Sequence, residues 1–294
     1  MGYPKTKIYT DSSHYIGIPE IRRPKAKRPK PKGKAQTTNA DKVEFDEQYR
    51  KYSKLRYAEK KKKLEEAFLQ KFQDEQLTKG FVEKNMERAN RNRMQRKKRF
   101  ERKVKLQQWN YFLTFTYSDE KLNEDDFRKK LMNSLRHLAS RRKWKYAGVW
   151  ERSPKNNRLH FHCLAYIPDG QMIGEIVLVK DYDTVSRRMQ ETYQNSHFLE
   201  HYGRNDFKKI GHKLMLPKII DYIGKYIEKS GEKIVYSRGL ATYFVSDILD
   251  DDVLCAYKED DIRFILADNF LCIDEGEIMG EVSPEVIEKM PKAN

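Results

Sequence analysis

Large apolar side chains recur every three or four residues in the stretch that follows residue 40. Leu64, Phe68 and Phe72 are examples, within a segment that lacks proline and is rich in helix formers. This is the repeat of an amphipathic helix, and many of the intervening positions are basic. The pattern predicts basic amphipathic helices over residues 41–105, interrupted at Gly80.

A different pattern begins at Trp109. The segments WNYFLTFTY, KYAGVWE and LHFHCLAY are rich in aromatic and β-branched residues, which is typical of strands. The turn-forming RSPKNN joins the second and third segments, so we expect these two to form an antiparallel hairpin. Between the first and second segments a helix should begin at about Glu124, with Asn123 as its N-cap and Asp126 in its first turn.

The rest of the chain predicts two more helices and an ambiguous tail. Residues 183–202 look helical, and a further helix should start near Pro217, which a first turn tolerates, and end at about Lys229. Beyond residue 240, YFVSDIL and DIRFILADNFLCI suit either strands or short helices. Together these elements predict a domain that combines strands, two of them in an antiparallel hairpin, with helices, preceded by a basic helical segment.

Charge is distributed unevenly along the 294 residues. Residues 1–105 contain 32 Lys and Arg against 14 Asp and Glu, whereas residues 241–294 contain 4 against 14. Residues 1–40 are rich in proline and lysine and poor in large apolar side chains, so burial cannot offset the entropy of ordering them. We expect a disordered basic arm over 1–40, a basic helical DNA-binding or linker segment over 41–105, an α+β domain over 106–240 and an acidic extension over 241–294.

The basic charge indicates a nucleic-acid partner. Binding to DNA neutralises phosphates and releases counterions, so a concentration of Lys and Arg favours it. We expect DNA contacts from Arg96, Lys97, Lys98 and Arg99, and from Lys229. The alternative interpretation is a solvated segment that contacts no partner.

Other signals favour an unexported protein. The three cysteines, Cys163, Cys255 and Cys272, form no CxxC pair, and the N-terminus lacks the apolar segment of a secretory signal. A run of about 18 apolar residues is also lacking, so no membrane partner is expected. We therefore expect a cytoplasmic protein.

Candidate chemistry lies in LHFHCLAY. In a strand His160 and His162 share one face, with Cα atoms about 6.6–6.8 Å apart, so both imidazoles could reach one metal ion. Alternatively, they could simply form hydrogen bonds within or beside a core.

If the hairpin turn is centred at residues 155–156, Glu151 lies opposite His160 on the same face, whereas a slip of one residue would leave Glu151 exposed. One carboxylate and two imidazoles suit Mg²⁺ or Mn²⁺, with positions left for phosphate oxygens.

The helix expected near Pro217 contributes a second candidate group. Tyr222 and Tyr226 are four residues apart and share a helical face, and Lys225 and Lys229 each follow a tyrosine by three residues. A tyrosine needs activation to act as a nucleophile, because its unperturbed pKa is about 10. The alternative is that these tyrosines form the edge of an apolar core, since isoleucines also recur in this helix.

In chain order, FLTFTY, HFH and YIGKY resemble the three motifs of the HUH endonucleases, and specifically of rolling-circle replication initiators of small bacterial phages and plasmids. The resemblance covers roughly residues 109–229. It implies the HUH endonuclease fold for the 106–240 domain, which is an α+β fold with a central antiparallel sheet flanked by helices. It also implies a divalent metal (Mg²⁺ or Mn²⁺) and cleavage of one DNA strand through a tyrosine.

The resemblance also implies individual roles. His160 and His162 match the metal-binding histidines, and Glu151 lies where related initiators have a metal-binding glutamate. Tyr222 matches the nucleophile and Lys225 the lysine that follows it. Tyr226 matches the second tyrosine of two-tyrosine initiators, although many initiators use only one. Conjugative relaxases usually complete the metal site with a third histidine, so a glutamate here favours replication over transfer.

The implied reaction is nicking and rejoining of single-stranded DNA at a replication origin through a 5′-phosphotyrosine. The released 3′-hydroxyl would prime a polymerase in the bacterial host. Because the chain has no GxxxxGK[ST] motif, unwinding would require a host helicase. The alternatives are a mobilisation relaxase or single-strand transposase with the same chemistry, and a non-catalytic DNA-binding protein on a degenerate HUH scaffold.

Overall fold

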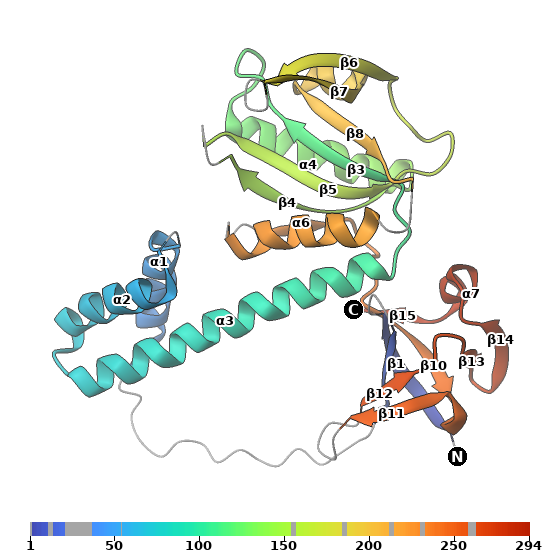
Figure 1. Ribbon diagram of the computed structural model, residues 1–294, viewed down its shortest axis with the longest axis horizontal. Helices are drawn as coiled ribbons and strands as arrows, with labels where there is room; N and C mark the ends of the chain where they lie inside the picture. The colour runs from blue at the N-terminus through green and yellow to red at the C-terminus, as the bar shows by residue number, and fades with distance from the viewer. Residues whose placement is uncertain are drawn as a thin grey trace. The chain divides into compact units, whose positions relative to one another are not determined.

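The computed structural model describes residues 2–10, 14–20, 37–53, 55–153, 157–183, 187–211, 215–229, 233–257 and 263–294 (Figure 1). The chain divides into two compact units. The larger consists of Met1–Ile21, Arg99–Tyr226 and Glu232–Asn294, and the smaller of Arg22–Lys98 and Ile227–Gly231. The fold is α+β with antiparallel sheets and flanking helices, as expected from the sequence.

The smaller unit is built from α1 (Asn39–Lys51), α2 (Tyr57–Phe72) and the first part of α3 (Glu75–Lys105). A capping box between Thr38 and Asp41 starts α1. The three helices share one apolar core, made of Phe45, Leu64, Phe68, Phe81, Val82 and Met86. The predicted basic helices are therefore present.

The predicted interruption at Gly80 is wrong. Helix α3 continues through Gly80, and the break falls instead at Gln73, whose φ of 54° ends α2 in the left-handed region. A helical glycine costs only about 1 kcal/mol relative to alanine. Burial of the adjacent Phe81 and Val82 outweighs that cost.

The central sheet of the larger unit has five antiparallel strands in the order β8-β3-β5-β4-β9. These strands are β3 (Tyr111–Thr116), β4 (Lys145–Arg152), β5 (Leu159–Tyr166), β8 (Asn205–Lys209) and β9 (Ile234–Tyr236). β4 and β5 form the predicted antiparallel hairpin.

Helix α4 (Glu124–Arg141) packs on one face of this sheet. Its N-cap is Asn123, as predicted, and the Asn123 side chain accepts a hydrogen bond from the Asp126 N–H. Phe127 and other apolar residues of α4 form a core with Phe115 and Phe161 from the strands. Because side chains alternate along a strand, the two histidines beside Phe161 face away from α4.

The helix predicted over residues 183–202 is wrong for most of its length. Strands β6 (Ile176–Asp183) and β7 (Arg188–Asn195) form a two-stranded ribbon. Among the described residues of this range, only α5 (Ser196–His201) is helical. The burial of β7 alternates, with Thr192 and Gln194 buried and Tyr193 exposed. That period of two is the repeat of a strand rather than of a helix.

A second sheet of eight strands joins the two ends of the chain. Its N-terminal strands are β1 (Tyr3–Thr10) and β2 (Tyr15–Ile18). Its C-terminal strands are β10 (Tyr243–Ile248), β11 (Val253–Tyr257), β12 (Arg263–Leu266), β13 (Leu271–Asp274), β14 (Glu277–Glu281) and β15 (Lys292–Ala293). The short η1 (Asp250–Asp252) and helix α7 (Pro284–Lys289) lie between these strands in the chain.

The predicted disorder of residues 1–40 is therefore wrong at residues 3–10 and 15–18. β1 pairs with β10, and Ile8 is fully buried in a core that includes Phe244 and Ile248. The acidic extension supplies the apolar surface that the N-terminal segment lacks on its own. Residues 21–36 of the predicted arm lie outside the described residues. The ambiguous YFVSDIL segment contains β10, and the described part of DIRFILADNFLCI contains β12 and most of β13.

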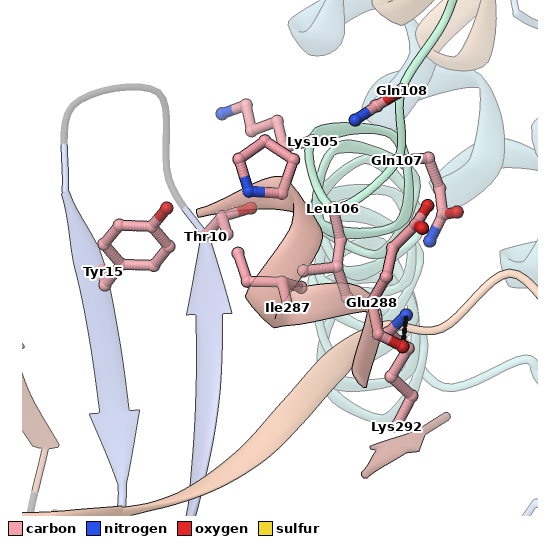
Figure 2. Close-up of a pocket in the computed structure, with 10 residues that line it drawn as sticks. Thr10, Tyr15, Lys105, Leu106, Gln107, Gln108, Ile287, Glu288 and Lys292 are labelled. Carbon is pink, nitrogen blue, oxygen red and sulfur yellow. Dashed lines mark hydrogen bonds between the residues drawn. The ribbon is translucent and has the colours of Figure 1, made fainter. Parts of the chain in front are cut away.

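A cavity of about 130 Å³ lies where this sheet meets the end of α3 (Figure 2). Thr10 and Tyr15 line it from β1 and β2, Ile287 and Glu288 from α7, and Lys105 from α3. Nothing in its lining belongs to the predicted site residues. In the parts of the chain listed above, every helix is too short or too polar to cross a lipid bilayer.

Two glycine substitutions test the packing of the two units. A Cβ on Gly148 in β4 would lie 2.4 Å from the Cys163 Cβ, whereas a Cβ on Gly80 would have nothing within 4 Å. Gly148→Ala should lower the free energy of unfolding by about 1–3 kcal/mol through overpacking. Gly80→Ala should raise it by about 0.5–1 kcal/mol. Calorimetric unfolding of both variants checks this; equal effects of the two substitutions would contradict it.

Candidate active site

Polar side chains gather on the face of the five-stranded sheet that is turned away from α4. The pairing of β4 with β5 sets Glu151 directly opposite His160, which is the predicted register. On the other side of β5, Thr116 lies opposite His160 and Thr114 opposite His162. Directly opposed residues project from the same face, so these five side chains form one patch.

Both imidazoles are held by hydrogen bonds from this patch. The Nδ1 atom of His160 lies 2.7 Å from the Thr116 Oγ1, and the Nδ1 of His162 lies 3.1 Å from the Thr114 Oγ1. The Nε2 of His162 lies 2.7 Å from a carboxylate oxygen of Glu151. Such contacts at Nδ1 fix the ring orientation, as in many metal-binding histidines. They leave the Nε2 of His160 for chemistry, whereas the Nε2 of His162 is engaged by Glu151.

The surroundings favour a neutral His160. Burial lowers the pKa of its imidazole, and the nearby His162 lowers it further, while the Glu151 carboxylate acts in the opposite direction. A neutral imidazole keeps the lone pair that a metal ligand needs.

The predicted metal ligands share a face but do not form a finished metal site. Over the described ranges, no group of three or more His, Cys, Asp and Glu side chains is placed so that it could hold a metal ion. Glu151 and His162 instead contact each other directly. The donor types suit Mg²⁺ or Mn²⁺, but this arrangement would have to open for an ion to enter.

Helix α6 (Met215–Lys229) brings both tyrosines to this patch. It starts two residues before Pro217 and runs alongside the sheet (Figure 1). The Tyr222 and Tyr226 rings lie 5.7 and 5.5 Å from the His162 ring, and 4.8 Å from each other. The helical spacing therefore places both hydroxyl-bearing rings beside His162.

The two tyrosines have different environments. Tyr222 is 39% exposed, and its ring also meets Phe112 at 5.9 Å. Tyr226 is half-buried, and its hydroxyl forms side-chain hydrogen bonds with Tyr222 and Glu151. Burial, followed by these interactions, raises the pKa of Tyr226 far above its usual value. Tyr222 is thus the more accessible of the two phenols, and Tyr226 is held as a protonated phenol.

The cations predicted to act in the site or on DNA lie in different places. Lys225 is exposed on α6, in the turn between the two tyrosines. The side chain of Lys229 lies outside the described residues. Arg96, Lys97, Lys98 and Arg99 lie on α3, with Lys98 and Arg99 exposed. These four are part of the basic helical segment.

Sequence reasoning missed three polar residues of this face. The alternation of FLTFT would have placed Thr114 and Thr116 on one side of β3, opposite to Phe115, so their role had a local signal. Asp206 had none. It reaches the face because β8 pairs with β3 and sets Asp206 opposite Thr114, a contact between residues 92 positions apart in the numbering.

Comparison with known families adds one finding. Residues 110–231 match the family model described as Replication-associated protein ORF2/G2P. The matched segment runs from just before β3 to just after α6, so it includes both histidines, Glu151 and both tyrosines. Neither a curated protein nor a solved structure matches the chain. The segment that carries the site thus resembles replication-associated proteins, and this supports a role in DNA replication.

Proposed function

We propose that this protein is a rolling-circle replication initiator that nicks and rejoins single-stranded origin DNA through a tyrosine. The observation that carries the proposal is the position of the Tyr222 ring, exposed to solvent and 5.7 Å from the His162 ring. An accessible phenol next to a carboxylate and two imidazoles suits attack on a phosphodiester. The family match to replication-associated proteins supports the same substrate class.

In the proposed reaction, the Tyr222 hydroxyl oxygen bonds to the scissile phosphorus and the bond from phosphorus to the 3′-oxygen breaks. The proton lost by the tyrosine is balanced by the proton that the departing 3′-oxygen takes up. The products are a 5′-phosphotyrosine and a free 3′-hydroxyl, which a host polymerase can extend after a host helicase has unwound the duplex. Attack by a 3′-hydroxyl on the phosphotyrosine reverses the reaction and joins the strand.

Two neighbouring side chains have supporting roles in this proposal. Tyr226 positions Tyr222 through the hydrogen bond between their hydroxyls, and it can attack as a second nucleophile only after its bonds to Tyr222 and Glu151 are released. Lys225 is exposed on the same helix and offsets negative charge on the attacked phosphate.

The proposal includes Mg²⁺ or Mn²⁺ held by Glu151, His160 and His162. Binding requires the direct contact between Glu151 and His162 to give way, because the three side chains do not already form a metal site. When bound, such an ion would polarise the scissile phosphate. We further propose that the protein acts in the cytoplasm of a bacterial host.

Tyr222→Phe should reduce the covalent protein–DNA adduct to background while leaving non-covalent DNA binding within about twofold of wild type, because only the hydroxyl is lost. Tyr226→Phe should slow adduct formation without abolishing it. Denaturing gels after incubation with labelled single-stranded DNA and Mn²⁺ measure both. Tyr182→Phe, at an exposed tyrosine of β6, is the matched control. A persistent adduct in Tyr222→Phe would refute the assignment.

Mn²⁺ should raise the unfolding temperature of the wild type. A ligand at about 100 times its Kd stabilises the folded state by about 2.7 kcal/mol. Glu151→Gln and His162→Gln should each remove most of this shift, because each removes one ligand of the proposed set. Glu120→Gln changes an exposed glutamate and should keep the shift. If Mn²⁺ raised the unfolding temperature equally in the wild type and in all three variants, the ion would bind elsewhere. Scanning calorimetry measures these shifts without reference to activity.

A further inference from the structure

A strip of alternating charge begins at the residue before β8 and runs along this strand, which lies at one end of the five-stranded sheet. Arg204, Asp206 and Lys208 project from one face, because side chains alternate along a strand. The intervening Asn205 and Phe207 are buried on the other side. Both cations of the strip are exposed and Asp206 is half-buried.

This charged strip lies beside the candidate active site. Asp206 is paired with Thr114, the residue that contacts His162. Lys208 is paired with Phe112, whose ring meets the Tyr222 ring at 5.9 Å. β8 is separated from β5 only by β3, so the strip and the histidines are roughly 10 Å apart on the same face.

The start of the strip is fixed by a close approach of the backbone. Gly203 has a φ of 128°, and a Cβ there would lie 2.6 Å from the Ser118 nitrogen and 3.0 Å from the Thr116 carbonyl oxygen. The next residue, Arg204, accepts a hydrogen bond from the Thr116 N–H at 2.8 Å through its carbonyl. Arg204 is thereby anchored next to the strand that carries the two site threonines.

The carboxylate in the middle of the strip is flanked by both cations. Burial raises the pKa of Asp206, while a hydrogen bond from the Tyr193 backbone and the charges of Lys208 and Arg204 act against that rise. A carboxylate repels a phosphate, so the strip is not a uniform anion site. Along the strand, the strip presents first the Arg204 cation, then the Asp206 carboxylate as a hydrogen-bond acceptor, and then the Lys208 cation.

We propose that this strip binds the DNA strand on one side of the scissile phosphate. Arg204 and Lys208 contact backbone phosphates, and Asp206 accepts a hydrogen bond from the amino group of a base. The inference rests on the proposed function, and it names the surface that holds the strand while Tyr222 attacks.

The geometry suits an extended strand. The Cα atoms of Arg204 and Lys208 are about 13 Å apart along β8, so the two cations contact different phosphates. Between them, bases can donate to the carboxylate through amino groups, such as cytosine N4 or adenine N6, or through the ring N–H groups of thymine and guanine. The thymine N3–H lies between two carbonyl oxygens, which repel a carboxylate, whereas the cytosine amino group lies at the edge of the ring with two N–H donors. Asp206 therefore favours cytosine over thymine.

The phosphate contacts are tested by the salt dependence of binding. Fluorescence anisotropy of a labelled mixed-sequence single strand, in EDTA, gives Kd over a series of salt concentrations. Arg204→Gln with Lys208→Gln should weaken binding and reduce the magnitude of the slope of log K against log salt by about 1.4, because each phosphate contact on a single strand contributes about 0.7. Because EDTA prevents metal-dependent cleavage, this assay measures binding alone. A failure of the DNA-binding proposal can therefore be distinguished from a failure of the proposed nicking reaction, which the adduct assay tests.

The control removes two charges from the other side of the sheet. Lys129→Gln with Lys130→Gln changes exposed lysines of α4 and should leave the slope near that of wild type. A slope lowered equally in both double variants would mean that only net charge matters. A slope unchanged in the β8 variant, with its unfolding temperature intact, would also overturn the proposal.

The base contact is tested with homopolymers. Wild type should bind oligo(dC) about fivefold or more tightly than oligo(dT), the lower end of what one specific base contact contributes. Asp206→Ala should lose this preference while binding both strands, since the repulsive charge is removed as well. A ratio of the two Kd values that is the same in Asp206→Ala and wild type would contradict the role of Asp206.

Discussion

The register between β4 and β5 is the constraint on which the candidate site depends. It sets Glu151 opposite His160 and therefore puts a carboxylate and two imidazoles on one face. A slip of one residue would turn Glu151 away from the two imidazoles, to the opposite face of the sheet. Gly148, paired with Cys163, allows the two strands to approach closely in the middle of the hairpin.

The same alternation lets β5 serve two purposes. Phe161 and Cys163 are fully buried in the core beneath α4, while His160 and His162 face α6 and its tyrosines. The hydrophobic core thus fixes the position of the polar residues without contacting them. The threonines of β3 then orient both imidazoles, so the site is built mostly on rigid strands and one helix rather than on loops.

Features set by local patterns were predictable from the sequence, and features set by long-range pairing were not. The hairpin register, the Asn123 cap and the tyrosine face of α6 follow from turn residues and side-chain periodicity. The N-terminal strand β1 pairs with β10, more than 200 residues later, so nothing near it in sequence indicated order. Asp206 reached the site face for the same reason, through the pairing of β8 with β3.

The proposed reaction requires Tyr222 to form a covalent bond with DNA. The most direct measurement is to incubate the protein with Mn²⁺ and single-stranded DNA from its own replicon, digest protein and DNA, and locate the nucleotide-bearing residue by mass spectrometry. We expect a nucleotide joined through its 5′-phosphate to Tyr222. DNA cut to free 5′-phosphate ends with Tyr222 and Tyr226 both unmodified, or a nucleotide attached elsewhere in the chain, would contradict it.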